Sequence, residues 1–292
     1  MTFFYVKNII YIILVIVDKF YNKYLLNKKI HWSINYSRVY WNKIGTKKIY
    51  KIKNPKNKWF ADPQIIKKNK DHFIFFEDYS TIKKKGAISC IRINKNNKKK
   101  YYENIINENH HLSFPFIFRY KNCYYLIPET SEINMIKIYK CIKFPNKWIF
   151  YKKLLKSKSV DHVIFKSEKY WYLLNNERNF GEVYSKLVGY VSQNPISNKW
   201  KRVNIFKNSL LLGRNAGYFE DKKNKYRVCQ SYLPGRYGAG IFINRINKIT
   251  NKSYDEIIEK KYFPNIFSKI KGIHTLDSKD NFTVFDSSKW QS

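Results

Sequence analysis

Residues 59–66 read WFADPQII, and residues 73–78, after a polar turn, read FIFFED. Both runs are rich in aromatic and β-branched residues, which is typical of two antiparallel strands joined in a hairpin. Asp62 lies within the first run, although aspartate is a poor strand former and is costly to bury. Its position therefore needs an explanation beyond the hairpin itself.

The same apolar hairpin recurs four more times along the chain. The five units begin at Asp62, Phe114, Asp161, Asn215 and Ile273. Repeats of about 40–50 residues that hold four short strands each are typical of a β-propeller, in which a blade cannot bury both faces without its neighbours. The sequence therefore predicts an all-β, five-bladed β-propeller over residues 31–292. A β-sandwich is the alternative, but it gives no reason for one hairpin to recur in the same frame.

Further apolar runs are expected to form the outer parts of the blades. Residues 86–93 are predicted to be a third strand, and residues 147–155 and 199–206 are predicted to be outer strands. We expect their tryptophans, Trp148 and Trp200, to lie in the core or to pack between blades rather than to stack on a ligand.

Residues 1–30 precede the repeats and have apolar residues at helical spacing. The uninterrupted apolar run from Ile9 to Val17 is too short for the roughly 20 residues of a spanning helix, and no small-residue cleavage site follows it. With its flanking lysines, this segment is predicted to be a short helix on an anionic membrane surface, and packing on the domain or on a partner is the alternative. The expected location is cytoplasmic, peripheral at the inner face of the membrane.

The chain of 292 residues has a formal net charge of +36. Such a charge attracts polyanions whatever the fold. Because the basic residues are scattered through Lys/Asn turns, we interpret most of the charge as a solvated surface, with an acidic membrane or glycan as the alternative; nucleic acid is not expected as a partner. The four cysteines have neither zinc-site nor redox spacing, so they are predicted to be buried thiols in a reducing compartment. No metal and no cofactor is predicted.

Polar residues of all five units are predicted to meet at one mouth of the central channel. In a propeller blade, the start of the first strand and the end of the second lie at the same end of that channel. The candidate catalytic residues are Asp62, Glu129 and Asp161, and the candidate substrate-binding residues are His111, Arg214, Asn215, Gln230, Arg236, Tyr237 and His274. Converging carboxylates would separate each other's pKa values into one protonated acid and one ionised base, the pair that glycosyl chemistry uses. The alternative is that Asp62 and Asp161 only cap backbone N–H groups.

Six motifs in order carry a family resemblance: WFADPQII with FFED, HLSFPFIF with YLIPET, VDHVIF, GRNAGYFED, RYGAGIFINRI, and GIHTLD with FTVFD. Over about residues 31–288 this set resembles the propeller at the N-terminus of plant glucosamine inositolphosphorylceramide transferase and its bacterial relatives. That domain is similar in fold to the five-bladed furanosidases, such as arabinanases and invertases. The resemblance implies that Asp62 is the base or nucleophile, Asp161 the transition-state stabiliser and Glu129 the acid.

Two departures weaken the catalytic part of the resemblance. The third unit has Asp161-His162 where the relatives tend to have Asp-Pro, and no separate glycosyltransferase domain follows Ser292. In the plant protein, the transfer chemistry is usually assigned to that domain. The resemblance therefore implies a carbohydrate-linked propeller more firmly than it implies catalysis by the propeller.

The leading functional hypothesis is a protein of cell-envelope polysaccharide or glycolipid biosynthesis that binds a sugar, sugar nucleotide or glycolipid in the channel and promotes glycosyl transfer. Arg214, Arg236, His111 and His274 would hold an anionic phosphate or acidic sugar, although Arg236 also fits an exposed loop cation. The first alternative is a furanosidase-like glycoside hydrolase, against which stand the lack of an export signal and the cysteine pattern. The second is a non-catalytic sugar-binding module that serves a separate glycosyltransferase.

Overall fold

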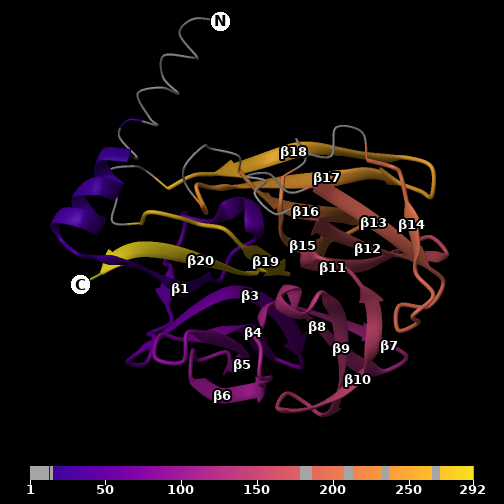
Figure 1. Cartoon of the computed structure of the whole chain (residues 1–292), viewed down its shortest axis with the longest axis horizontal. Helices are drawn as coiled ribbons and strands as arrows, with labels where there is room; N and C mark the ends of the chain where they lie inside the picture. The colour runs from indigo at the N-terminus through magenta and orange to yellow at the C-terminus, as the bar shows by residue number, and fades with distance from the viewer. Residues whose placement is uncertain are drawn as a thin grey trace, which may run out of the picture.

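Five four-stranded antiparallel sheets are arranged around a central axis (Figure 1). The computed structural model describes residues 13, 16–177, 186–206, 213–231, 237–264 and 270–291. The inner strands contact one another in a closed ring, in the order β3, β7, β11, β15 and β19. The predicted all-β, five-bladed β-propeller with one short N-terminal helix is confirmed.

Four blades are continuous in sequence, and their strands run in chain order from the channel outward. The first blade consists of β3 (Lys58–Lys68), β4 (Asp71–Ser80), β5 (Lys85–Ile93) and β6 (Lys99–Ile106). The second consists of β7 (Ser113–Tyr120), β8 (Cys123–Glu129), β9 (Met135–Lys143) and β10 (Lys147–Lys156). The third consists of β11 (Ser159–Ser167), β12 (Tyr170–Glu177), β13 (Lys186–Ser192) and β14 (Lys201–Val203). The fourth consists of β15 (Asn215–Asp221), β16 (Asn224–Gln230), β17 (Ile241–Ile249) and β18 (Tyr254–Tyr262).

The fifth blade joins the two ends of the chain. It consists of β19 (Leu276–Lys279), β20 (Phe282–Gln291), β1 (Lys29–Ser37) and β2 (Tyr50–Lys51). The ladder between β1 and β20 runs from the pair Lys29 and Gln291 to the pair Ser37 and Thr283, and Figure 1 shows the indigo and yellow strands side by side. The hairpin repeat does not predict this closure, because the N-terminal strands belong to no repeat unit.

A β-bulge interrupts the inner hairpin at the same place in four blades. The register shifts lie between Ala61 and Gln64, Ser113 and Phe116, Val160 and Val163, and Asn215 and Gly217. Within these bulges Asp62, Phe114 and Asp161 have φ values of 53°, 42° and 53°. Outside glycine, aspartate and asparagine tolerate this left-handed region best, and a bulge redirects a side chain. The backbone therefore favours aspartate at the start of an inner strand.

Aromatic and aliphatic side chains fill the space between blades. Tyr36 stacks between Tyr50 and Phe282, with ring centroids 5.1 and 5.2 Å away. Trp148 packs edge-on against a ring of the neighbouring blade, and Trp200 is buried in the core, as predicted for both. The predicted outer strand over residues 199–206 is reduced to the three residues of β14.

One helical segment precedes β1, α-helical at residues 16–20 and continuing as the π-helical turn η1 (Tyr21–Leu25). None of the residues of η1 is buried. The segment's exposed apolar side chains are Ile16, Val17, Phe20, Tyr21, Tyr24 and Leu25. Two 3₁₀ turns lie elsewhere, η2 (Trp41–Lys43) and η3 (Ser131–Ile133). Within the described residues, no helix has the length and hydropathy needed to cross a bilayer.

His72 offers a test of the core between the first and fifth blades. Its ring stacks on Phe282 with centroids 4.0 Å apart, and neither ring nitrogen has a hydrogen-bond partner among the described residues. Burial lowers the pKa of His72 to about 4, whereas a histidine in an unfolded chain titrates near ~6.5. The unfolded state therefore binds more protons between these values, and stability is lost as the pH falls from about 6.5 toward 4.

We predict that His72→Phe keeps the stack and removes this loss. The free energy of unfolding in urea should rise by about 1–3 kcal/mol at pH 4.5 and by less at pH 8. An equal gain at both pH values would mean that packing, and not protonation, accounts for the change.

Candidate functional site at the channel mouth

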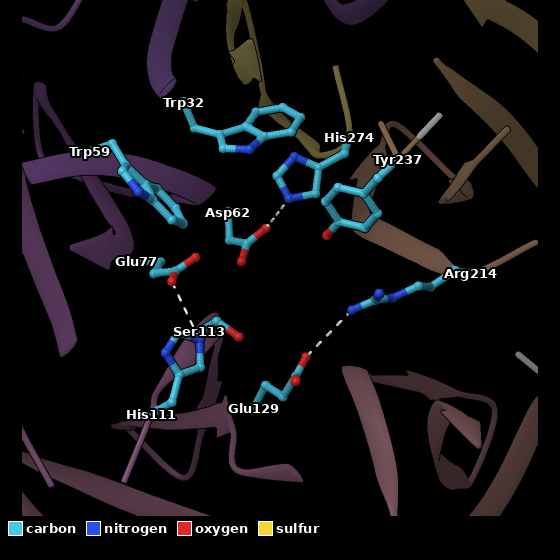
Figure 2. A pocket seen from close by; sticks show the side chains of 10 residues that line it. All are labelled: Trp32, Trp59, Asp62, Glu77, His111, Ser113, Glu129, Arg214, Tyr237 and His274. Carbon is cyan, nitrogen blue, oxygen red and sulfur yellow. Dashed lines mark ion pairs between the residues drawn. The ribbon is translucent and has the colours of Figure 1, made fainter. Parts of the chain in front are cut away.

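A pocket of about 210 Å³ lies at the end of the channel where the inner strands begin. Figure 2 shows its side chains converging from different blades: Trp32, Trp59, Asp62, Glu77, His111, Ser113, Glu129, Arg214, Tyr237 and His274. The volume is below the roughly 300–1,000 Å³ of pockets for drug-sized ligands. The pocket therefore suits a single small ring.

Asp62, His274 and Asp286 form a chain of ion pairs in one wall. The Nε2 atom of His274 lies 3.0 Å from Asp62 Oδ1, and its Nδ1 atom lies 2.8 Å from Asp286 Oδ2. Burial lowers the pKa of His274, but the attraction of Asp286 and Asp62 outweighs it and raises this pKa well above its ordinary value. The resulting imidazolium lies between the two carboxylates and lowers the pKa of Asp286.

Asp286 also binds backbone groups of two blades. It accepts hydrogen bonds from the backbone N–H of Asp62 at 3.1 Å, from those of His274 and Thr275 at 3.0 Å each, and from the Thr275 hydroxyl at 2.5 Å. Burial raises the pKa of Asp286, but His274 and these donors outweigh it, so the pKa is lowered. Asp286 is thus a fully satisfied carboxylate at the junction of the fifth and first blades.

Each oxygen of Asp62 has a different partner. Oδ2 accepts the backbone N–H of Phe114 at 3.2 Å, and Oδ1 faces His274. Asp62 therefore caps the next inner strand with Oδ2 and lines the pocket with Oδ1. One side chain has both the capping role and the position expected of a site residue.

Arg214 crosses the opposite side of the pocket. Its guanidinium forms a bidentate pair with Asp161, one contact of which is 3.1 Å, and its Nη2 atom lies 3.7 Å from Glu129 Oε2. Glu129 Oε1 also accepts a hydrogen bond from the Ser131 hydroxyl at 2.8 Å. Burial lowers the pKa of Arg214, but Asp161 outweighs it and raises the pKa above its ordinary value. Among the described residues, Arg214 is the arginine that lines the pocket, and carboxylates already neutralise its charge.

Aromatic rings form the remaining walls. The ring of Trp32 lies against His274 with centroids 4.1 Å apart, and Trp59 stacks on Tyr79 at 4.4 Å. Neither tryptophan was predicted as a site residue. Trp59 stands three residues before Asp62, a signal that the sequence offers, whereas Trp32 reaches the pocket only because β1 closes the last blade.

The structure brings together most of the predicted site residues. Asp62, His111, Glu129, Arg214, Tyr237 and His274 line the pocket. Asp161 lies behind it, where it holds Arg214. Asn215 and Gln230 belong to a buried backbone network, because the Asn215 side-chain amide donates to Asp161 O at 2.8 Å and the Gln230 N–H donates to Arg214 O at 2.7 Å. Arg236 lies outside the described residues. The roles of all ten residues stay predictions.

Glu77 and Asp78, the last two residues of the run FIFFED, point to opposite sides of β4. Glu77 lines the pocket. Asp78 instead accepts a hydrogen bond from Ser89 at 2.8 Å and pairs with Lys58 at 3.1 Å within the blade. Side chains of consecutive strand residues alternate between faces, so only one of the two can reach the channel.

Asp62, His274 and Asp286 also have donor atoms within 4.8 Å of one another, close enough to hold a metal ion. Each imidazole nitrogen already faces a carboxylate, and a metal ligand would have to be neutral imidazole. A cation would therefore replace the ion pairs, and the arrangement fits an ion-pair chain better than an open coordination site.

Comparison with known families identifies the chain. The model of the N-terminal domain of glucosamine inositolphosphorylceramide transferase 1 matches residues 39–280. The chain belongs to this family. The transferase of Arabidopsis thaliana is 30% identical over 207 residues, which cover 68% of this chain and 27% of the relative. That of Oryza sativa subsp. japonica is 28% identical over 204 residues, again 68% and 27%. The predicted resemblance is confirmed, and the chain spans about a quarter of the length of these relatives.

Solved structures of similar fold include glycoside hydrolases. The Bombyx mori GH32 β-fructofuranosidase superposes with a TM-score of 0.55 at 12% identity, over 70% of this chain and 51% of that protein. The Cellvibrio cellulosa α-L-arabinanase superposes with a TM-score of 0.53 at 12% identity, over 80% and 90%. At such low identity the likeness shows the five-bladed fold alone.

We predict that Asp286→Asn destabilises the protein by about 3–5 kcal/mol, because it leaves His274 and several buried N–H donors without their carboxylate. The measurement is the free energy of unfolding in urea at pH 7. Asp280→Asn is the matched control: Asp280 pairs with Lys67 at 2.7 Å, but its side chain is 51% exposed, so the loss should stay below about 1 kcal/mol. Similar losses in the two variants would contradict a special role for Asp286.

Proposed function

We propose that this channel mouth binds the sugar part of a substrate and promotes glycosyl transfer in the synthesis of a cell-envelope glycolipid or polysaccharide. The observation that carries the proposal is a pocket for one small ring that combines tryptophan faces with several carboxyl groups. Membership of the transferase family supports a sugar or glycolipid as substrate.

The two kinds of wall match the two kinds of surface on a sugar. A sugar ring presents C–H groups on its faces, which pack on aromatic rings such as Trp32 and Trp59, and hydroxyl groups at its edge, which donate to carboxylates such as Asp62 and Glu129. Trp59 is held in place by its stack on Tyr79 before any ligand arrives. A wall ordered in advance loses little side-chain entropy on binding.

The pocket favours a hydroxyl-rich ring over a phosphate group. Arg214 is engaged by Asp161 and Glu129, and His274 lies between two further carboxylates. Among the described residues, a phosphate in the pocket would therefore meet more negative than uncompensated positive charge. If the donor is a sugar nucleotide, we expect its phosphates to lie outside the pocket.

Asp62 is the group best placed to act on the anomeric carbon. It is paired with the His274 imidazolium, and its second oxygen is fixed by the Phe114 N–H. A carboxylate held in one orientation next to a sugar can attack the anomeric carbon or take the proton of an acceptor hydroxyl. Water in place of that acceptor would make the same site a glycoside hydrolase. Retained binding without turnover would instead indicate a sugar-binding module for a separate glycosyltransferase.

Variants of the aromatic wall and of Asp62 separate these functions. Trp59→Ala should weaken binding of the cognate sugar about tenfold, because loss of a stacking face costs roughly 1–1.5 kcal/mol. Asp62→Asn should abolish turnover while the protein still folds. Binding is measured by thermal shift and calorimetry against arabinose, fructose, glucosamine, N-acetylglucosamine, glucuronic acid and the corresponding nucleotide sugars.

Asp71→Asn serves as the control, since Asp71 pairs with Arg92 on the outside of the first blade. It should leave both binding and turnover unchanged. Binding of a sugar that is equally tight in wild type and Trp59→Ala would remove the pocket from the proposal.

We also propose that the N-terminal helix holds the protein at an anionic membrane surface. Its apolar side chains are exposed, and its one acidic residue, Asp18, is tied to the fifth blade by Lys271 at 2.8 Å and by the Trp290 indole at 3.0 Å. This anchor fixes the base of the helix against the propeller. A helix with exposed apolar residues and flanking lysines suits the headgroup region of an anionic leaflet.

The expected result is cosedimentation with vesicles of phosphatidylcholine and phosphatidylglycerol that falls at least tenfold in Phe20→Asp. Phe20 is 56% exposed on the helix, and Ile82, 73% exposed in a turn of the first blade, provides the matched variant Ile82→Asp. That control should bind vesicles like wild type. Equal binding by Phe20→Asp and wild type would contradict the membrane role of the helix.

A further inference from the structure

Glu77 differs from the other carboxyl groups of the pocket. It lies on β4 opposite Ala61, next to the bulge that holds Asp62, and only 4% of its surface is exposed. Its Oε1 atom has no hydrogen-bond partner among the described residues. Asp62 and Glu129, by contrast, each face a cation and accept a hydrogen bond. A buried carboxylate without such partners is costly, so the protonated form of Glu77 is favoured.

The charges of neighbouring groups also bear on whether Glu77 is protonated. The titratable groups that act on Glu77 or face it come from three blades: Asp62, Tyr79, His111, Glu129, His274 and Asp286. Burial is the main cause that raises the pKa of Glu77 well above its ordinary value, the charge of Asp62 adds to it, and His274 opposes it. Burial and the charge of Asp62 therefore both favour the protonated form of Glu77.

His111 presents a neutral N–H group to Glu77. Its Nδ1 atom accepts the backbone N–H of Gly86 at 3.0 Å, so the ring proton resides on Nε2. That nitrogen lies 3.4 Å from Glu77 Oε1, beyond ordinary hydrogen-bond length. Burial lowers the pKa of His111, so the ring stays neutral and does not draw the proton from Glu77. After a small approach, the same N–H can stabilise the carboxylate that remains once Glu77 has released its proton.

Gly86 is the residue that permits this arrangement. A Cβ atom at this position would lie 2.8 Å from Glu77 Oε1, 2.9 Å from His111 Cε1 and 2.4 Å from the carbonyl oxygen of Leu112. Any larger residue would displace the pair or the loop before β7. The close approach of Glu77 and His111 thus depends on a glycine in the neighbouring strand.

We propose that Glu77 donates a proton to the oxygen that leaves the sugar while Asp62 acts on the anomeric carbon, and that the sugar donor is accordingly an O-glycoside. This inference rests on the proposed function. The glycosidic C–O bond breaks with its electron pair on the departing oxygen, which takes the proton of Glu77 and leaves as an alcohol. The anomeric carbon is bonded either by an oxygen of Asp62 or by an acceptor oxygen whose proton passes to Asp62. Glu77 becomes a carboxylate facing His111 Nε2–H.

The need for a proton decides the class of donor. An alkoxide is too basic to leave without protonation, so a glycoside requires an acid, whereas a nucleoside diphosphate leaves as a stable anion without one. Tight binding of such a diphosphate would instead call for uncompensated cations, and both Arg214 and His274 are already paired in this pocket.

The test compares wild type with Glu77→Gln, which keeps the shape of the side chain and removes its acidic proton. Arabinofuranosides and glucosaminides are offered as methyl glycosides and as 2,4-dinitrophenyl glycosides. Glu77→Gln should lower turnover of the methyl glycosides about 10²–10⁴-fold and that of the dinitrophenyl glycosides less than tenfold, because dinitrophenolate leaves unprotonated. The decline of the wild-type rate at high pH should disappear in the variant. Glu103→Gln, which changes a 52% exposed glutamate side chain of the same blade, should match wild type.

Further measurements distinguish failure of this inference from failure of the proposed function. Infrared difference spectra of wild type minus Glu77→Gln at pH 7 should contain the band of a protonated carboxyl group, and its absence would overturn the inference. Equal losses on both leaving groups would also overturn it, since they indicate a positioning role. If sugar nucleotides are turned over in an Asp62-dependent way and glycosides are not, the inference fails while the proposed function stands. If neither class of donor is turned over or bound, both fail.

Discussion

The inner strand of every blade is a sheet edge, and at three of the blade junctions its free N–H groups find acceptors in the neighbouring blade. Side chains supply them: Asp286 accepts from Asp62, Asp62 accepts from Phe114, and Asn176 accepts from Asn215 at 2.8 Å. A buried N–H group left without an acceptor costs about 1–3 kcal/mol. Polar residues on the channel walls therefore help to join the blades, whether or not a ligand is bound.

This structural constraint also orients the site. One oxygen of Asp62 is committed to a backbone N–H group, so the direction of its second oxygen follows from the strand geometry. Asp286 holds His274 in the same way, through the backbone and through the ring. Groups fixed by the fold need little rearrangement when a ligand arrives. The same side chains consequently carry stability and chemistry, and changes to them are expected to affect both.

Much of the fold can be predicted from the sequence, because each inner hairpin repeats in one frame and aspartate suits the left-handed bulge at its start. The closure by β1 cannot, because the pairing of Trp32 and Ser288 links residues at opposite ends of the chain. The site is predictable to the level of the channel mouth. Within it, whether Glu77 or Asp78 faces the channel depends on how the side chains of β4 alternate relative to those of β3. The bulge at Asp62 shifts that alternation by one residue. Asn215 stands at the equivalent position of another blade, yet its side chain serves the backbone.

The distribution of charge gives the last constraint on the ligand. The protein has a net charge of +36 with 21 acidic residues, and five of these, Asp62, Glu77, Glu129, Asp161 and Asp286, gather at or behind one pocket. Within the part of the chain that the structure describes, Arg214 and His274 balance them from within. The basic exterior attracts anionic material over about 8–10 Å, the screening length at physiological salt. A ligand whose anionic portion lies outside the pocket and whose uncharged sugar ring lies inside it suits both the basic exterior and the acidic pocket. A glycan or glycolipid at an anionic surface has this form, whereas a small sugar phosphate, which would bring its charge into the pocket, does not.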